Sequence, residues 1–203
     1  AELQAVVEVA GMADRVVAAH CHGKPGIMAA LTAGVRTIEH GTYLDEEACD
    51  AMRETGAILV PTRTIVHDIL ATRAVPEYAM VKLEAIADQH AAAIALAHER
   101  RVTIASGSDI ALTGRELPAS WGHNGAELAR LAECGLSPLA AIEAATATGP
   151  ETLGPQAPRS GQLRAGYDAD VIIVDGDPLA DLAVLADPDR ITGVWRAGRR
   201  LKG

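Results

Sequence analysis

The stretch that decides the fold is residues 15–40, RVVAAHCHGKPGIMAALTAGVRTIEH. An apolar run over 15–19 predicts a strand, an alanine-rich segment over 24–33 predicts a helix, and a second apolar run over 35–39 predicts another strand. A glycine follows the helix, and each strand runs directly into a histidine. A strand, a helix and a second strand in so short a span are typical of a βαβ unit with parallel strands.

The same alternation continues on both sides of this unit. Residues 1–13 carry apolar side chains at helical spacing. Further along the chain, the order helix, strand, helix, strand is predicted over residues 45–55, 57–60, 77–100 and 102–105. The strands are continuously apolar, which indicates a parallel sheet covered on both faces. A doubly wound sheet and a (β/α)8 barrel both fit this order, but no GxGxxG turn follows the first strand, which favours the barrel.

The pattern changes in the second half of the chain. Two helices are predicted over residues 123–134 and 138–147, and Ser137 is a suitable N-cap for the second. Short strands separated by glycine and proline are then predicted over residues 162–164, 169–174, 192–196 and 199–201. The sequence therefore predicts two units, an α/β unit over residues 1–157 and a small β unit over residues 158–203.

The composition bounds the class of protein and its partners. The chain has 203 residues, 49% of them hydrophobic and 22% charged, which are values of a globular protein. A formal net charge of −9 predicts no nucleic-acid partner and no binding to an anionic membrane. No apolar run reaches the ~20 residues of a membrane span. The three cysteines lie far apart without a CxxC motif, which favours a reducing compartment and predicts a cytoplasmic protein.

Three polar side chains lie where predicted strands end. His20 and His40 follow the first two strands, and Asp109 follows the strand predicted over 102–105. The carboxyl ends of barrel strands meet at one rim, so these three side chains can converge on a single cation. Two imidazoles and one carboxylate suit Zn²⁺ and neighbouring transition metals. The alternative is that each is an ordinary hydrogen-bonded side chain, and no local motif such as HExxH decides between the two.

The other candidate residues have less support. His22 could join His20 as a ligand if the strand continued, but Gly23 follows at once, so we expect His22 in a loop where it contacts substrate. Cys21 would then point to the opposite side and pack. His123 lies in a loop, where functional residues are common. His67, His90 and His98 are expected to have no role. His90 and His98 lie on a long predicted helix with polar faces.

Several of these segments together resemble the amidohydrolase superfamily. The resemblance rests on Ala-His20-Cys-His-Gly, on Glu39-His40-Gly-Thr, on Pro61-Thr62 and on Ala105-Ser-Gly-Ser-Asp109, which are similar to the ends of the family's fifth to eighth strands. It continues through Gly135-Leu-Ser-Pro138, residues 141–146, the glycine-rich segment 161–175 and Val194-Trp-Arg-Ala-Gly198. The imidazolonepropionase-related branch, which includes Xaa-Pro dipeptidase-like enzymes, is the most similar.

The resemblance implies a fold, a cofactor and a reaction. It implies a divalent metal pair, usually zinc, with His20 and His40 on one metal and Asp109 on the other. A water activated by metal would attack an amide or peptide C–N bond, and Asp109 would carry its proton to the leaving amine. Tyr43 and His123 would contact a small amide or dipeptide substrate.

One departure from the family is informative. The family's first-strand His-x-His is absent upstream of His20, and no lysine precedes it. The chain is therefore expected to be the C-terminal half of a (β/α)8 barrel, strands 5–8, plus the C-terminal strands of a composite β-sandwich. Alone it is expected to be inactive. The alternative is a non-catalytic half-barrel that forms a homo-oligomer or binds its missing N-terminal half, and a third reading is an unrelated α/β binding module.

Overall fold

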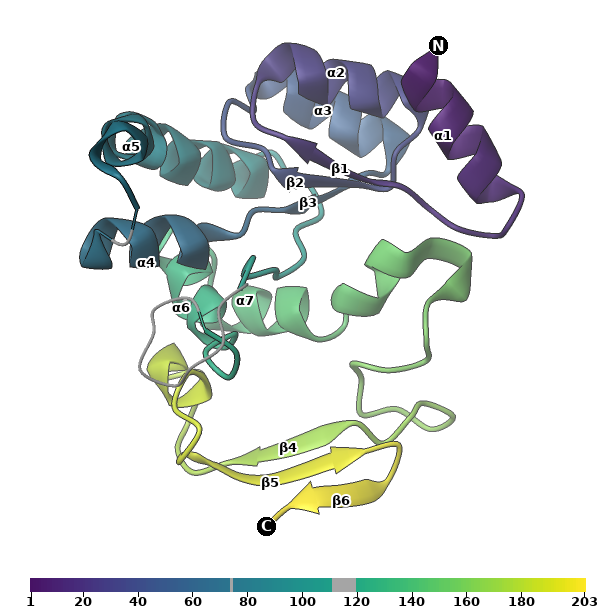
Figure 1. Cartoon of the computed structure of the whole chain (residues 1–203). Helices are drawn as coiled ribbons and strands as arrows, with labels where there is room; N and C mark the ends of the chain where they lie inside the picture. Colours follow the sequence, from purple (N-terminus) through teal and green to yellow (C-terminus); the bar gives the residue numbers. More distant parts are fainter. Residues whose placement is uncertain (74, 111–119) are drawn as a thin grey trace.

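Two three-stranded sheets organise the chain (Figure 1). The computed structural model describes residues 1–73, 75–110 and 120–203. The first sheet has the order β1-β2-β3 and is parallel, with strands β1 (Ala18–Cys21), β2 (Thr37–His40) and β3 (Ile58–Val60). The seven α-helices of the described chain are α1 (Glu2–Gly11), α2 (Lys24–Ala33), α3 (Glu46–Thr55), α4 (Arg63–Thr72), α5 (Glu77–Glu99), α6 (Ala126–Glu133) and α7 (Pro138–Ala145).

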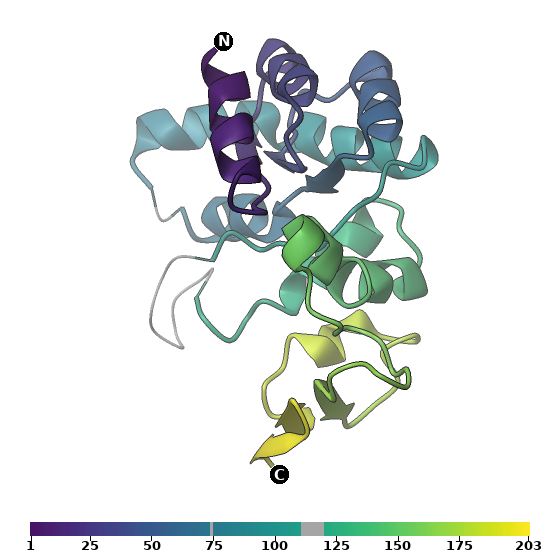
Figure 2. The same cartoon turned by 90° about the vertical axis from the view of Figure 1, so that its right-hand side faces the viewer.

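The C-terminal sheet is antiparallel and has the order β4-β5-β6. Its strands and the two short 3₁₀ helices of this region are η1 (Gly149–Gln156), β4 (Val171–Val174), η2 (Leu182–Leu185), β5 (Ile191–Arg196) and β6 (Arg199–Lys202). Both views place helix α1 and this sheet at opposite ends of the molecule, with α6 and α7 between the two sheets (Figures 1 and 2). The predicted boundary between residues 157 and 158 falls just after η1.

Local sequence signals set the ends of α2 and α3 as predicted. Helix α2 has a proline in its first turn and ends at Gly34, whose φ of 91° is left-handed. Helix α3 begins after Asp45, whose side chain accepts a hydrogen bond from the Ala48 N–H at 3.0 Å. The Ser137 side chain caps α7 in the same way, through the N–H of Ala140 at 3.2 Å.

The parallel sheet packs one face on the helices, and its other face is exposed only along β1. Alternate residues point to opposite faces of a strand, so Ala19 and Cys21 pack on the helix-side core with Ile38 and Leu59. The predicted packing role of Cys21 is therefore confirmed. The opposite face lines a cavity of about 280 Å³, formed by Val16, Ala18, Thr37, Glu39, Val60, Ser106, Gly149, Thr152 and Leu153.

Two strand predictions need correction. The strand predicted over 102–105 is reduced to one parallel bridge between Leu59 and Ile104, with backbone bonds on both sides of Leu59. The strand predicted over 162–164 is absent. Gly161 and Gly166 on either side of it have left-handed φ values, and the Tyr167 N–H bonds to Arg164 at 3.1 Å, so this segment turns instead of pairing.

Helix α4 follows β3 and was not predicted.

Among the described residues, no helix is both long and apolar enough to cross a membrane. The three cysteines are free thiols, and two of them are buried.

Candidate metal centre

Three histidines meet at the carboxyl ends of β1 and β2. The group consists of His20 in β1, His22 just after it and His40 at the end of β2, and one ligand atom of each lies within 4.8 Å of the others. Nε2 of His40 lies 2.9 Å from Nδ1 of His20. The rings of His22 and His40 are stacked with centroids 4.7 Å apart. The structure thus brings together the strand-end rings of His20 and His40, and it adds His22, which we expected in a loop that contacts substrate.

A left-handed backbone brings His40 into this group. In the parallel register His20 faces Glu39, so regular alternation would turn the next residue, His40, away from His20. His40 instead has a φ of 72°, a conformation that is uncommon for residues other than glycine. This departure from strand geometry lets the ring turn towards His20, and such strained positions cluster at functional sites.

Two threonine hydroxyls fix the rings of His22 and His40. The Thr62 hydroxyl donates to the carbonyl of Pro61 at 2.6 Å, so its oxygen is left to accept from Nδ1–H of His40 at 2.7 Å. Nε2 of His40 therefore carries the lone pair and faces His20. Thr42 bonds Nδ1 of His22 at 2.8 Å and leaves Nε2 of that ring for a ligand. Metal-binding histidines in proteins are oriented by partners of this kind.

Burial favours the neutral form of the His40 and His22 rings. The pKa of His40 is lowered to about 4, chiefly by burial and also by the neighbouring rings of His22 and His20, while the charge of Asp109 opposes the shift. The pKa of His22 is lowered for the same reasons, with burial first and His20 second. A neutral imidazole has the free lone pair that a metal requires, so both rings are ready to bind one at neutral pH.

The donor set fits a divalent transition metal. Zinc–nitrogen distances of about 2.0–2.1 Å place two ligand atoms about 3.0–3.4 Å apart, depending on the angle at the metal. The distance of 2.9 Å between Nδ1 of His20 and Nε2 of His40 is close to that separation. Three imidazole nitrogens also suit Zn²⁺, whereas Mg²⁺ and Ca²⁺ prefer oxygen ligands.

Asp109 lies at the edge of this site. It is exposed, has a left-handed φ of 51°, and follows the segment that bridges to β3. Its charge partly offsets the lowering of the His22 and His40 pKa values. It also adds to burial, the main cause of the raised pKa of Glu39. It is nevertheless outside the group of ligand atoms that lie within 4.8 Å. Its predicted roles as ligand and as proton carrier stay predictions.

The other predicted contacts lie further out. Tyr43 is 46% exposed, and its backbone N–H bonds the carbonyl of His22 at 2.9 Å. His123 lines a separate cavity of about 500 Å³, together with Trp121 and residues of β5 and β6. The predicted substrate contacts through Tyr43 and His123 are untested by this arrangement.

Two buried residues were missed or dismissed at the level of sequence. His90 on α5 was expected to have no role on a polar face, but it is 1% exposed and its Nε2–H donates to the backbone carbonyl of His40 at 3.2 Å. Burial lowers its pKa to about 4. Glu127 on α6 is fully buried and bonds the first turn of α4. A signal for His90 was available in its alanine-rich neighbours on α5, which indicate a face in close contact with the sheet.

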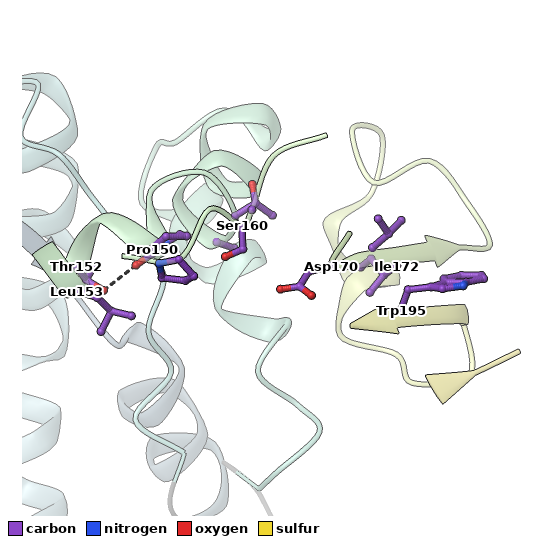
Figure 3. Close-up of a pocket in the computed structure, with 13 residues that line it drawn as sticks. Pro150, Thr152, Leu153, Ser160, Asp170, Ile172 and Trp195 are labelled. Atoms are coloured by element: carbon purple, nitrogen blue, oxygen red, sulfur yellow. Dashed lines mark hydrogen bonds between the residues drawn. The ribbon is translucent and has the colours of Figure 1, made fainter. Parts of the chain in front are cut away.

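Another cavity has no catalytic constellation. It measures about 530 Å³ and lies between η1 and the paired strands β4 and β5 (Figure 3). Asp170 points into it, but Oδ1 of that carboxylate already accepts the Ala197 N–H at 2.7 Å. The rest of its lining is mainly apolar, with Ile172 and Trp195 on the sheet side. Among the described residues, the histidine cluster therefore remains the best candidate for a metal-binding and catalytic site.

Comparison with known proteins identifies the family. A model described as the amidohydrolase family matches residues 1–201. The chain belongs to the amidohydrolase family. It is 43% identical over 205 residues to ochratoxinase from Aspergillus niger, a match that covers 100% of this chain and 41% of that relative. The resemblance inferred from the strand-end motifs is confirmed.

Solved structures agree with this assignment. The crystal structure of A. niger ochratoxinase matches with a TM-score of 0.89 at 44% identity, over 100% of this chain and 45% of that one. A Xaa-Pro dipeptidase with bound methionine matches with a TM-score of 0.86 at 32% identity, over 100% of this chain and 48% of that one. A prolidase complexed with N-methylphosphonate-L-proline gives 0.87 at 31% identity, over 99% and 48%. This amidohydrolase chain thus spans less than half the length of these relatives and shares their α/β fold.

Proposed function

We propose that this chain carries part of the active site of a metal-dependent hydrolase that cleaves amide or peptide C–N bonds. The observation that carries the proposal is the cluster of His20, His22 and His40, in which threonine hydroxyls orient the rings of His22 and His40. The kinship to ochratoxinase and to Xaa-Pro dipeptidase supports hydrolysis as the reaction class. Because the chain covers 41% of ochratoxinase, the activity of a complete enzyme is part of the proposal.

In this proposal His20 and His40 hold one divalent metal, with zinc the best match to the donor set. His22 either completes that set or contacts substrate, and Asp109 binds a second metal in the complete enzyme. A metal at this position would polarise the scissile carbonyl and make water a stronger nucleophile at neutral pH. Thr42 and Thr62 keep the histidine lone pairs directed to the site.

Asp109 is the proton carrier in this proposal. Its carboxylate takes a proton from the attacking water and later gives it to the nitrogen of the leaving amine. Three features support the role: its exposure, its position after the bridge to β3, and the effect of its charge on His22 and His40. Tyr43 and His123 are proposed to contact the substrate.

The proposed substrates are dipeptides and related amides of amino acids. Two relatives support this substrate class: one is a Xaa-Pro dipeptidase, and the other is a prolidase complexed with N-methylphosphonate-L-proline. The proposed half-barrel consists of strands 5–8 of a (β/α)8 barrel, and β4–β6 are proposed to belong to a composite β-sandwich.

The test compares Asp109→Asn with the wild type in the complete protein, with zinc supplied and a panel of Xaa-Pro dipeptides as substrates. We expect turnover to fall by about 100-fold or more, the usual scale for a lost proton carrier. Asp168→Asn, at an exposed aspartate of the C-terminal unit, is the matched control and should retain turnover. Equal turnover in the wild type and Asp109→Asn would reject the proton-carrier role.

A second proposal concerns association. On the sheet face opposite the helices, Ala18 and His20 of β1 are exposed, and β1 is an edge strand of the described sheet. Such faces and edges tend to associate. We propose that a second copy of the chain, or an N-terminal half, covers this face. Light scattering should find a species larger than a monomer, either for the chain alone or after addition of a separately expressed N-terminal half. A chain that stays monomeric in both samples would contradict the proposal.

A further inference from the structure

Glu127 stands out among the buried residues that the proposed reaction does not use. It belongs to α6, is fully buried, and its two carboxylate oxygens accept three hydrogen bonds from the start of α4. Oε1 accepts the Arg63 N–H at 2.8 Å, and Oε2 accepts both the N–H and the hydroxyl of Thr64, at 2.7 and 2.6 Å. A buried carboxylate is costly unless it is bonded in this way.

The residue that precedes these donors explains the arrangement. Thr62 is the N-cap of α4, and an N-cap threonine ordinarily accepts a hydrogen bond from the first turn of its own helix. Here the Thr62 hydroxyl bonds Pro61 and His40 instead. Glu127 satisfies the N–H groups of Arg63 and Thr64. Burial raises the pKa of its carboxyl to about 7, whereas these hydrogen bonds and the helix N-terminus favour the charged form.

The Thr62 backbone needs support as well. Its φ of 58° is left-handed, an outlier for a β-branched residue. The hydrogen bonds from the next two residues to Glu127 hold the chain immediately after that outlier. Conformations of this kind persist only where the surroundings over-determine them.

We propose that Glu127 is a positioning residue for the metal site: by capping α4 from α6, it frees the Thr62 hydroxyl to hold His40. The proposal rests on the proposed metal role of His40. Loss of the Glu127 carboxylate leaves the first turn of α4 without acceptors. The Thr62 hydroxyl then competes to cap its own helix, and His40 loses the partner that fixes its tautomer.

The first measurement needs no metal. Nitrogen-15 NMR of the histidine rings in the metal-free chain reports which ring nitrogen of His40 carries the proton. We expect Nδ1–H in the wild type and in Glu133→Gln, a control at an exposed glutamate of the same helix. In Glu127→Gln we expect a mixture of the two tautomers. Unchanged Nδ1–H in a folded Glu127→Gln would overturn the proposal.

A milder variant keeps the test decisive if Glu127→Gln does not fold. Thr64→Val removes only the hydroxyl bond to Glu127 and retains both backbone bonds. Because the Thr64 hydroxyl helps to hold the carboxylate over the two N–H groups, its loss should weaken the cap and shift the His40 tautomer part of the way. A fully wild-type tautomer in Thr64→Val, with Glu127→Gln unfolded, would likewise overturn the proposal, because the carboxylate would then serve stability alone.

The second measurement separates this inference from the metal role of His40. Titration with Zn²⁺ alone should give a dissociation constant about 10- to 100-fold weaker in Glu127→Gln than in Glu133→Gln, the usual scale for a lost outer partner of a ligand. Equal constants would count against the positioning role. If no variant binds Zn²⁺ but the tautomer shifts as expected, the metal proposal fails and the link from Glu127 to His40 stands.

Discussion

His90 is expected to make the chain sensitive to acid. The ring is 1% exposed, and burial lowers its pKa from 6.5 to about 4 in the folded chain, with the charge of Arg63 adding to the effect. In the unfolded chain the ring titrates near 6.5. Between these two values the unfolded chain binds the proton and the folded chain does not. Stability is therefore full above pH 6.5 and is lost progressively as the pH falls towards 4.

The size of the loss follows from the shift. One pKa unit corresponds to about 1.4 kcal/mol, so lowering the pH from 7 to 4.5 removes about 2–3 kcal/mol through this one ring. For a chain of this length that is a fall of about 5–10 °C in melting temperature. The ring lies against the carbonyl of His40 and near the Arg63 guanidinium, and both of these groups remain in the variant proposed next.

The assay is urea unfolding followed by circular dichroism at pH 7 and pH 4.5. His90→Gln keeps an N–H donor for the carbonyl of His40 but cannot titrate. Its stability should fall between the two pH values by about 2–3 kcal/mol less than that of the wild type. His98→Gln, at an exposed position of the same helix, should behave as the wild type does. An equal fall in the wild type and in His90→Gln would refute the reasoning.

Two further substitutions test the fold. Leu59→Ala opens a cavity where β3 packs on the helices, and because the side chain is 1% exposed we expect a loss of about 2–5 kcal/mol in urea unfolding; a loss under 1 kcal/mol would contradict this packing. Asp45→Ala removes the cap of α3 and should cost about 1 kcal/mol, seen as a fall of about 2–4 °C in melting temperature. Glu54→Ala, at the exposed end of the same helix, is its control, and equal melting of the two variants would argue against the cap.

The sequence predicts best what adjacent residues determine. Helix α2 has the predicted bounds because its proline, its alanines and Gly34 act locally. The strand over 102–105 is reduced to a bridge because its extent depends on pairing with β3, which lies more than 40 residues earlier. The apolar pattern marks a segment as fit for a sheet, but it does not say how many residues find a partner.

The candidate site divides in the same way. His20 and His40 were predicted because the carboxyl ends of parallel strands meet at one edge of a sheet. No comparable local signal predicts the left-handed backbone at His40 or the hydrogen bond between His40 and the Thr62 hydroxyl. Glu127 caps a helix 64 residues before it in the sequence, a contact that only the packing of α4 against α6 creates.

The central claim is that His20 and His40 hold a divalent metal, with His22 beside them as a further ligand or as a substrate contact. Isothermal titration of the metal-free chain with Zn²⁺, beside His40→Ala and His98→Ala, tests it most directly. We expect the wild type and His98→Ala to bind one Zn²⁺ per chain and His40→Ala to bind at least 10-fold more weakly. Binding by His40→Ala equal to that of the wild type, or no binding by the wild type, would contradict the account.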